Sequence, residues 1–539
     1  MTTSFAALLL LVTLTLSAGG FNAVDLLLLV LFALATPWFV VGFWNAAIGF
    51  IIMRCTRDPA AAVMPQAAAA ASPESLVGST AIVMCVRNEA PERVIRNLVA
   101  MMDDLASAGV AARFHVYVLS DTSRPDLAIA EEQAYAALAE EWTDRLAVTY
   151  RRRETNTGFK AGNIRDFLDR WGNDHDFMVT LDADSFMPAS AILRMVGIIE
   201  RDPRLGMRSW TIGSAWWQAD CGPYWGHNAV IRVAPFKQHC AIPPLAGHGI
   251  LRGEVLSHDQ IEAALMRRAG FDVRVLPDED LGWEENPPTL VEYIRRDLRW
   301  LQGTLQYVFF IGRPGLKIVS RFQLVFAMLM FAGSPAWIAL LLVGTFVMAT
   351  APSAGAVIDA DYGAPLLVVI LLMWFAAKAL TVIDVLARRP LRRAYGGSLR
   401  FLASVAAETV FSLLMLPILW LCHTLFLAGL PFGRAIGWIG QRRDDHAIPW
   451  SAAFRQLWPH TVLGGTCLAV LAVLHPVALP YLLVLLAGGL ALSIPFCVVT
   501  SWPPFGRALT RAGIGRLPEE TAPPASLTTL ASLSSKPPE

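Results

Sequence analysis

Two aspartates one residue apart, Asp182 and Asp184, follow a mostly apolar run in the segment VTLDADSF at 179–186. Residues two apart on a strand point to the same side, and open parallel sheets bind ligands at the carboxyl ends of their strands. Two hard oxygen ligands at such a strand end suit Mg²⁺ or Mn²⁺, which keeps waters and takes substrate phosphates as further ligands. A solvated turn also accounts for an isolated pair of this kind, because Asp is common in turns.

Other polar residues stand at the ends of predicted strands or in a glycine-flanked loop. Such positions suit contacts with a nucleotide, a diphosphate or a sugar. Each residue alone would pass as an exposed charge or a helix cap, but all of them in this order would be hard to assemble by chance. They are Arg87 and Glu89 in CVRNEAPE, Asp121 in VLSDTS, and Lys160 and Asn163 in GFKAGNI.

Three later motifs contain further candidate site residues, each of which also has a structural interpretation. Asp259 would pass as an N-terminal helix residue. Trp300 precedes an apolar segment by about twenty residues and would serve as a membrane-interface anchor. The motifs are YWGHN with His227 and Asn228, LSHDQIEAALMRRAG with Asp259, and YIRRDLRWLQG with Arg296, Arg299, Trp300 and Gln302.

The segments that carry these residues read as an α/β domain from about 78 to 313. TAIVMCV (80–86), RFHVYVLS (113–120) and HDFMVTLD (175–182) are apolar runs rich in β-branched residues, with helical patterns between them. Strands that alternate with helices predict a parallel sheet.

The composition indicates a membrane protein around this domain. Of 539 residues, 55% are hydrophobic and only 16% charged, against about 25% charged in soluble domains. The net charge is zero, so charge gives no indication of a nucleic acid partner, and seven scattered cysteines without a C-x-x-C pair argue against disulfides or zinc. Apolar runs occupy 5–20, 24–53, 324–349, 365–386, 401–430, 460–478 and 480–500.

The apolar runs and the loops between them predict five regions. The arginines at 54, 57, 388, 389, 392, 393 and 400, with the basic residues after 312, put the α/β domain in the cytoplasm, because basic loops stay on that side. The regions are a transmembrane helical hairpin at 1–53, a linker at 54–77, the α/β domain at 78–313, transmembrane and interfacial helices at 314–505, and a cytoplasmic or disordered tail at 506–539.

The run 401–430 does not fit simple counting of spans. Basic residues flank it on both sides, and Pro417 lies in its middle. Thirty residues cover about 45 Å as a helix, which cannot cross a core of about 30 Å twice. We expect an interfacial helix followed by a kinked or re-entrant piece. Gln441, Arg442 and Arg443 follow it and could form a flap over the nucleotide, although the need to hold topology explains basic residues there as well.

The motifs together resemble inverting glycosyltransferases of family 2 with the GT-A fold. That family has the pattern D, D-x-D, D, then Q/R-x-x-R-W, which matches Asp121, Asp182-x-Asp184, Asp259 and Arg296-x-x-Arg299-Trp300. LSDTS, GFKAGNIRDF, LDADSFM, YWGHNAVIRVAPFKQHC, LSHDQIEAALMRRAG and RRDLRWLQG further resemble the glucans biosynthesis glucosyltransferase H family, over about residues 75–520. The resemblance implies a membrane protein with a cytoplasmic GT-A domain inserted between transmembrane helices.

The resemblance also implies an activity. The chain would sit in the bacterial inner membrane, use UDP-glucose to elongate a growing glucan chain of the osmoregulated periplasmic type, and pass that chain through the lipid bilayer, with a periplasmic glucan-processing protein as a possible partner. Mg²⁺ or Mn²⁺ would be held by Asp182 and Asp184. The roles implied for the other residues are nucleotide-sugar binding for Arg87, Glu89, Asp121, Lys160 and Asn163, general base for Asp259, and acceptor or diphosphate contacts for His227, Asn228, Arg296, Arg299, Trp300 and Gln302.

Two departures and two alternatives accompany this interpretation. The segment 205–224 is shorter than in that family, and Arg296 stands where cellulose synthases have Gln. One alternative is a membrane glycosyltransferase that adds a single sugar to a lipid or other acceptor without transport. The other is a transporter or receptor whose middle domain only binds nucleotide, for which Asp259 would be dispensable.

Overall fold

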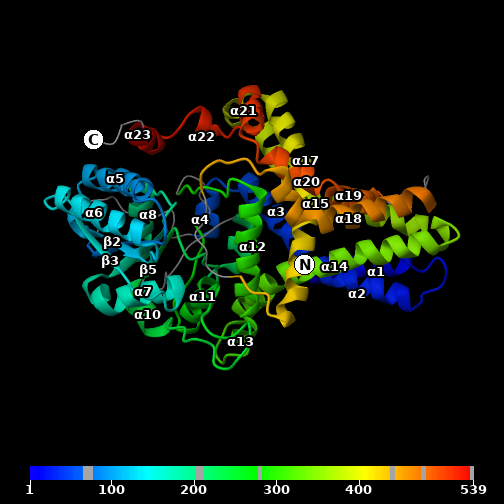
Figure 1. Ribbon diagram of the computed structural model, residues 1–539, viewed down its shortest axis with the longest axis horizontal. Coiled ribbons are helices and arrows are strands. Elements are labelled where there is room, and N and C mark those ends of the chain that lie inside the picture. The colour runs from blue at the N-terminus through cyan, green and yellow to red at the C-terminus, as the bar shows by residue number, and fades with distance from the viewer. Residues whose placement is uncertain (65–76, 202–211, 277–281, 437–442, 475–480, 535–539) are drawn as a thin grey trace.

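The computed structural model of the chain describes residues 1–64, 77–201, 212–276, 282–436, 443–474 and 481–534 (Figure 1). Within these residues, five strands form a sheet in the order β3-β2-β1-β4-β5. β1, β2, β3 and β4 run parallel, and β5 pairs with β4 antiparallel, so the sheet is mixed. The strands are β1 (Thr80–Val86), β2 (Phe114–Ser120), β3 (Ala147–Arg152), β4 (Phe177–Asp182) and β5 (Ala229–Arg232).

Helices cover both faces of the sheet (Figure 1). The strands alternate their side chains between two apolar clusters, because successive residues of a strand point to opposite faces. Ile82 and Met84 pack against the helices on one face, whereas Ala81 and Val83 pack against those on the other. The first face carries α5 (Pro91–Ser107), α6 (Pro125–Glu141) and α8 (Ala189–Arg201), and the second carries α7 (Phe159–Trp171), α10 (Val233–His239) and α11 (Asp259–Arg268).

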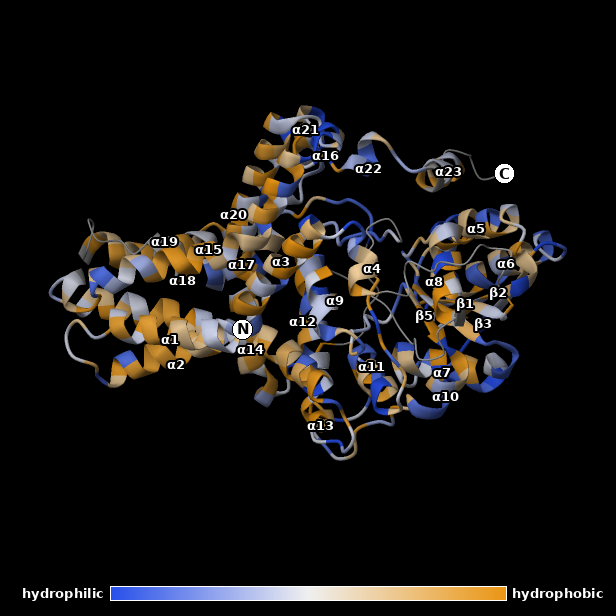
Figure 2. Cartoon of the chain, turned by 180° about the vertical axis from the view of Figure 1, so that it is seen from behind, coloured by the Kyte–Doolittle hydropathy of each residue, from blue (hydrophilic) through white to orange (hydrophobic). Residues whose placement is uncertain are grey.

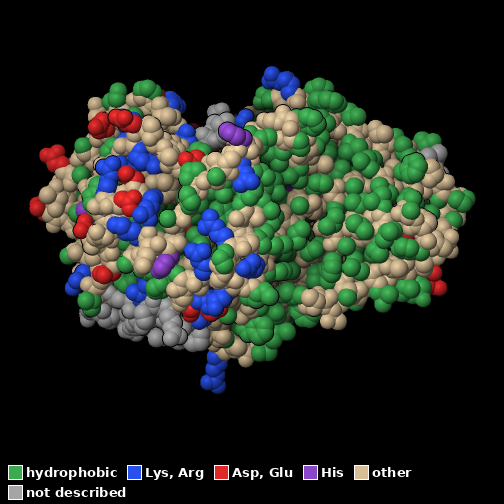
Figure 3. All heavy atoms as spheres, turned by 90° about the horizontal axis from the view of Figure 1, so that it is seen from below, with side chains coloured by type: hydrophobic (Ala, Val, Ile, Leu, Met, Phe, Trp, Pro, Cys, Tyr) green, Lys and Arg blue, Asp and Glu red, His purple; other side chains and the backbone are tan. Residues whose placement is uncertain are grey.

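The other half of the molecule is a bundle of apolar helices (Figure 2). Its surface is dominated by hydrophobic side chains, whereas acidic side chains gather over the sheet domain (Figure 3). Five helices among the described residues are long and apolar enough to cross a membrane. They are α3 (Pro37–Cys55), α14 (Ile318–Thr350), α15 (Ala360–Ala387), α17 (Ser398–Gly429) and α18 (Trp450–Leu474).

Shorter helices complete the fold. α12 (Leu290–Leu305) lies between the sheet domain and the apolar bundle (Figure 1). The others are α4 (Pro59–Val63), α9 (Ile212–Gln218), α13 (Val308–Ile311), α16 (Arg389–Ala394), α19 (Tyr481–Ala491) and α20 (Ser493–Thr500).

The amino-terminal region contains three helices where the sequence predicted a hairpin of two. α1 (Thr2–Thr15) is followed by α2 (Ala23–Ala35), and the run expected as one long span breaks before α3. The break falls at Thr36 and Pro37, since proline has no N–H for the preceding turn and fits the first turn of a new helix.

The run 401–430 also differs from its expectation, because α17 is one continuous helix that includes Pro417. No break divides it into two helices. Gly489 of α19 packs so closely on Pro417 that a Cβ there would overlap the proline ring. The neighbouring helix therefore covers the site where proline removes a backbone hydrogen bond.

The tail, which the sequence predicted as cytoplasmic or disordered, is helical over much of its described length. It forms α21 (Pro503–Ala512), α22 (Pro518–Thr521) and α23 (Ala525–Ser534). Leu527, Leu530 and Leu533 of α23 lie three residues apart, so they share one helix face, and they pack against the apolar cluster that contains α5. The linker residues 65–76 and the first part of the shortened segment, 205–211, lie outside the described part of the chain.

The contact between α3 and α9 yields a prediction about stability. Replacing Gly213 with alanine would drive a Cβ into the carbonyl oxygen of Asn45 on α3. We expect G213A to lower the free energy of unfolding by about 1–3 kcal/mol, the usual cost of overpacking. Thermal unfolding in detergent measures this cost. The control is G42A, whose Cβ would meet nothing within 4 Å, and equal melting temperatures for the two variants would contradict the prediction.

Candidate active site

The parallel strands bring their carboxyl ends to one edge of the sheet. In the register of the sheet Cys85 of β1 pairs with Asp182 of β4, and Val86 pairs with Ser120 of β2. Asp121 and Glu89 follow these strand ends directly, so residues predicted from three separate motifs stand side by side. The edge therefore concentrates carboxylates, as the sequence predicted.

Asp182 is paired with Lys160, which reaches it from the first turn of α7. The same ammonium group donates a hydrogen bond of 2.7 Å to the carbonyl oxygen of Gly226. Burial disfavours both charges, but the pair outweighs burial: the pKa of Lys160 is raised, and the pKa of Asp182 falls to about 2, with His227 as a further positive neighbour. Both side chains are therefore charged at neutral pH.

Asp184 and Glu89 share a partner from a distant part of the chain. Arg443 forms an ion pair with Asp184 and donates hydrogen bonds of 3.0 to 3.2 Å to Glu89. Burial raises the pKa of Asp184 and Arg443 works against that shift. Beside it, Arg93 of α5 donates to Asp444 and to Glu285, each at 2.8 Å. Gln441 and Arg442 lie outside the described residues.

Asp121 and Asn163 are held from within the domain. Arg153, just after β3, donates to both carboxylate oxygens of Asp121, at 2.7 and 2.8 Å. Asn163 is buried; it accepts from Arg151 at 2.7 Å and donates to the carbonyl oxygen of Leu119 at 3.0 Å. The side chain of Asn163 thus braces β2 and β3.

The stretch 87–89 lies close to Asp121. Arg87 is half-buried, and burial lowers its pKa while Asp121 works against that shift. Asn88 adopts the left-handed conformation, with φ 54°, and its backbone N–H donates to the Thr122 hydroxyl at 2.8 Å. This bond ties the segment after β1 to the segment after β2.

Asp259 begins α11 and lies next to Gly226. A Cβ on Gly226 would stand 3.7 Å from Cβ of Asp259 and 3.9 Å from Nζ of Lys160. Gly226 has φ 85°, so a side chain there would meet both backbone strain and these neighbours. The Ser257 hydroxyl donates to Asp259 at 3.2 Å. Asp259, Lys160 and Asp182 therefore converge around one glycine.

His227 and Asn228 meet a carboxylate that the sequence did not indicate. Glu284 forms an ion pair with His227 and accepts from Nδ2 of Asn228 at 2.8 Å. Burial disfavours the charged imidazole, but Asp182 and Glu284 outweigh it and raise the pKa of His227. Asn228, with φ 50°, turns the chain into β5.

Helix α12 brings a set of basic and aromatic groups toward the carboxylates. Burial lowers the pKa of Arg299 to about 10 in spite of Asp182, and burial lowers that of Arg296 as well. The guanidinium of Arg296 lies over the Trp300 ring at 4.8 Å, and Trp300 is 44% exposed. Gln302 is buried, and its Oε1 accepts from the backbone N–H of Ile436 at 2.8 Å, so it holds the segment after α17.

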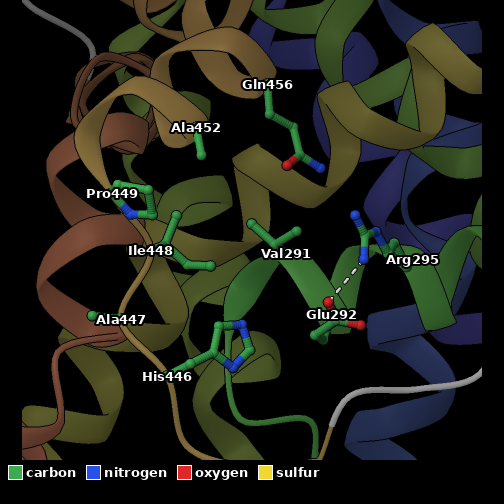
Figure 4. A pocket seen from close by; sticks show the side chains of 9 residues that line it. All are labelled: Val291, Glu292, Arg295, His446, Ala447, Ile448, Pro449, Ala452 and Gln456. Atoms are coloured by element: carbon green, nitrogen blue, oxygen red, sulfur yellow. Dashed lines mark hydrogen bonds and ion pairs between the residues drawn. The ribbon is translucent and has the colours of Figure 1, made fainter.

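A hollow of about 410 Å³ lies beside α12 (Figure 4). Val291, Glu292 and Arg295 line it from the helix, and an ion pair of 2.9 Å joins the last two. The segment 446–449 and the start of α18 form the other wall. It contains none of the aspartates at the strand ends, so it is distinct from the convergent site.

The two aspartates of the D-x-D motif fit a divalent cation in their chemistry. Both offer hard oxygen donors, and each already faces a positive group, Lys160 or Arg443. Mg²⁺ and Mn²⁺ need only one or two protein carboxylates when water and phosphate oxygens complete the shell. Among the residues that the structure describes, no three His, Cys, Asp or Glu side chains form a full metal site by themselves.

Some groups at the site carried no signal in the sequence. Arg153 and Glu284 are single charged residues outside any recognised motif, and only the fold shows that they face Asp121 and His227. Arg443 lay in a basic stretch for which topology was an adequate explanation. A search for basic residues near the strand ends would have found Arg153, but not its partner.

The pair of His227 and Glu284 predicts a pH-dependent contribution to stability. A raised pKa for His227 means that the pair stabilises the fold fully below the ordinary histidine value of about 6.5 and loses this contribution as pH rises through the raised value. We expect E284Q to lower the melting temperature most at about pH 5.5 and much less at about pH 9. The matched control is E285Q, since Glu285 pairs with Arg93. A deficit independent of pH for E284Q would contradict the assignment.

Known families match both halves of this arrangement. The family described as "Glycosyl transferase family 2" matches residues 81–239, and "Glycosyl transferase family group 2" matches residues 206–495. Among solved structures, a mannosyltransferase from Pyrobaculum calidifontis in complex with GDP-Man and Mn²⁺ is 16% identical, with a TM-score of 0.44, over 67% of this chain and 98% of that one.

Curated relatives match almost the whole chain. The glucans biosynthesis glucosyltransferase H of Xanthomonas campestris pv. campestris (strain B100) is 34% identical over 94% of this chain and 84% of its own length. Those of Pseudomonas putida (strain W619) and Cupriavidus pinatubonensis are 32% and 34% identical, and the match spans 62% and 63% of their lengths. The fold and these matches confirm the predicted resemblance: the chain is a glycosyltransferase and belongs to the glucans biosynthesis glucosyltransferase H family.

Proposed function

We propose that the protein is an inverting glucosyltransferase that uses UDP-glucose to elongate the backbone of osmoregulated periplasmic glucan. The observation that carries the proposal is the convergence of Asp259, Lys160 and Asp182 around Gly226, next to Asp184. An acceptor hydroxyl needs a base, and a nucleotide diphosphate needs positive charge. The carboxylate of Asp259 and the ammonium group of Lys160 both lie close to Gly226.

The nucleotide part of the donor would bind at the ends of β1 and β2. Glu89 and Asp121 offer carboxylate oxygens to the uracil and ribose, and Arg87 stands beside them. Arg153 fixes both oxygens of Asp121, so this acceptor is already oriented before the donor arrives. Asn163 contributes from behind, by holding β2 and β3 in position.

The diphosphate would lie between the D-x-D motif and α12. A Mg²⁺ or Mn²⁺ ion held by Asp182 and Asp184 would supply positive charge to the leaving diphosphate. For Asp184 to bind donor and ion, Arg443 must leave it, and its guanidinium is then free to contact phosphate oxygens. Among the described residues, Lys160, Arg296 and Arg299 also bring positive charge near these carboxylates.

Asp259 would remove the proton from the acceptor hydroxyl. General base catalysis of this kind contributes about 10²- to 10⁴-fold to a rate. The hydroxyl oxygen attacks the anomeric carbon, the bond to UDP breaks, and UDP leaves from the opposite side. Direct displacement inverts the anomeric carbon, so α-linked UDP-glucose gives a β-linked product.

The acceptor end of the glucan would lie over α12. Trp300 is partly exposed, and an indole face suits stacking on a sugar ring. His227 and Asn228, oriented by Glu284, offer polar contacts to sugar hydroxyls. Gln302 supports this site indirectly, through its bond to Ile436.

The apolar helices would place the enzyme in the bacterial inner membrane as a multi-pass protein with its catalytic domain in the cytoplasm. The five long apolar helices and the arginines around 388–400 support this orientation. The lipid bilayer is then one partner, and the growing glucan would leave through the helices toward a periplasmic glucan-processing protein.

The donor and the product are tested with a panel of radiolabelled UDP-sugars on membranes that contain the protein. We expect transfer from UDP-glucose alone, with a β-linked polymer as product by linkage analysis. Addition of one sugar to a lipid would support the alternative without polymer transport. Binding of nucleotide without any transfer would contradict an enzymatic role for these residues.

A further prediction concerns the general base, Asp259. We expect D259N to reduce glucosyl transfer by at least about 10²-fold, because proton removal is lost while the donor groups are intact. The measurement is incorporation of labelled glucose into glucan. The control is D169N, an exposed residue of α7 that pairs with Arg165. Full activity of D259N would contradict the mechanism.

Another prediction concerns the D-x-D motif. We expect D184N to weaken Mn²⁺ binding in the presence of UDP by at least about tenfold, since a carboxylate is a far better ligand for a hard cation than an amide. Electron paramagnetic resonance of free Mn²⁺ measures this affinity without reference to turnover. An affinity in D184N equal to that of D169N would remove Asp184 from the metal site.

A further inference from the structure

Three buried polar side chains connect α12 to two apolar helices. Oδ2 of Asp297 lies 2.5 Å from Nε2 of His423 on α17, and Nδ1 of the same ring lies 2.8 Å from Oγ of Ser334 on α14. The exposed fractions of Asp297, His423 and Ser334 are 9%, 6% and 1%. Each ring nitrogen of His423 therefore has its own partner.

The surroundings of this chain are apolar. Leu298, Leu301, Phe331 and Phe426 belong to the cluster around it, and the Phe331 ring meets the His423 ring edge-on at 5.2 Å. A polar group buried in such surroundings is costly unless it is hydrogen-bonded. Hydrogen bonds need a defined distance and direction, whereas apolar contacts do not. These two hydrogen bonds therefore specify the position of α12 relative to α14 and α17 more sharply than apolar contact does.

Asp297 and Arg299 lie on nearly opposite sides of α12. Residues two positions apart in a helix are separated by about 200° around its axis. With Asp297 against α17, Arg299 lies on the opposite side of the helix, where burial lowers its pKa and the nearby Asp182 works against that shift. The bond between Gln302 and Ile436 adds a second tie near the end of α12.

We propose that Asp297, His423 and Ser334 are positioning residues that fix the rotation of α12, and thereby hold Arg296, Arg299 and Trp300 over the reaction site. The inference rests on the proposed function, because it assigns these three groups to diphosphate and acceptor. It makes the apolar helices α14 and α17 part of the catalytic architecture. Ser, His and Asp in one chain also resemble a hydrolase triad, but a nucleophile needs access to substrate, and Ser334 is buried within α14.

The test uses the full-length protein in detergent, with H423F, D297N and S334A. We expect H423F and D297N to reduce glucosyl transfer about 10- to 100-fold, since a shift of about 1 Å can cost this much. Binding of uridine, which lacks the diphosphate, should change less than about threefold by calorimetry, because the nucleoside site at the strand ends is not held by α12. The rate of glucosyl transfer by S334A should lie between those of H423F and the wild type.

Two further variants separate positioning from general damage. H423Q can still donate to Asp297 and should recover most of the activity that H423F loses. H460F is the matched control, because His460 is also buried in the bundle but contacts Cys422, at 3.3 Å, and not α12. Equal losses in H423F and H460F, or in H423F and H423Q, would overturn the proposal.

Hydrogen exchange gives a readout that does not depend on activity. We expect faster exchange of the amides in 290–305 in H423F, with exchange in 91–107 of α5 unchanged. If the wild type transfers no sugar from any UDP-sugar, the proposed function fails. Hydrogen exchange still tests whether Asp297, His423 and Ser334 hold α12 in place. Unchanged exchange of 290–305 in H423F, in a protein that does transfer glucose, would overturn the positioning role alone.

Discussion

Negative charge is crowded at the carboxyl edge of the sheet, and the rest of the site depends on how basic groups neutralise it. Carboxylates so close together repel one another, and they remain ionised only when positive groups accompany them. Each basic partner comes from a different segment: a loop after β3, the start of α7, and a segment 354 residues away from Glu89 along the chain. The pairs are Asp121 with Arg153, Asp182 with Lys160, and Asp184 and Glu89 with Arg443.

This electrostatic arrangement gives the donor site two kinds of cation. Arg153 and Lys160 belong to the sheet domain and remain in place, so they organise Asp121 and Asp182 in advance. Arg443 follows the apolar helix α17 and spans Glu89 and Asp184. Under the proposed function, a nucleotide sugar and its cation would compete with this guanidinium, which would link donor binding to the segment between the apolar helices.

The sequence predicted the parts of the fold that depend on local pattern. β-Branched runs located β1, β2 and β4, and parallel pairing then required Asp121, Asp182 and Asp184 to meet. What it could not predict depends on neighbours distant in sequence. Asn163 and Gln302 form hydrogen bonds to Arg151 and Ile436 within the protein, and Glu284 pairs with His227. The helix α23 in the tail and the unbroken α17 are of the same kind, because packing against α5 and α19 decides them.

The most direct test of the account is an experimental structure of the full-length enzyme with UDP and Mn²⁺. The account predicts UDP between the ends of β1 and β2 and the D-x-D motif, with Mn²⁺ on Asp184, Arg443 released from that carboxylate, and Asp259 facing the space beside the β-phosphate. Nucleotide bound elsewhere, or bound while Arg443 still pairs with Asp184, would contradict it.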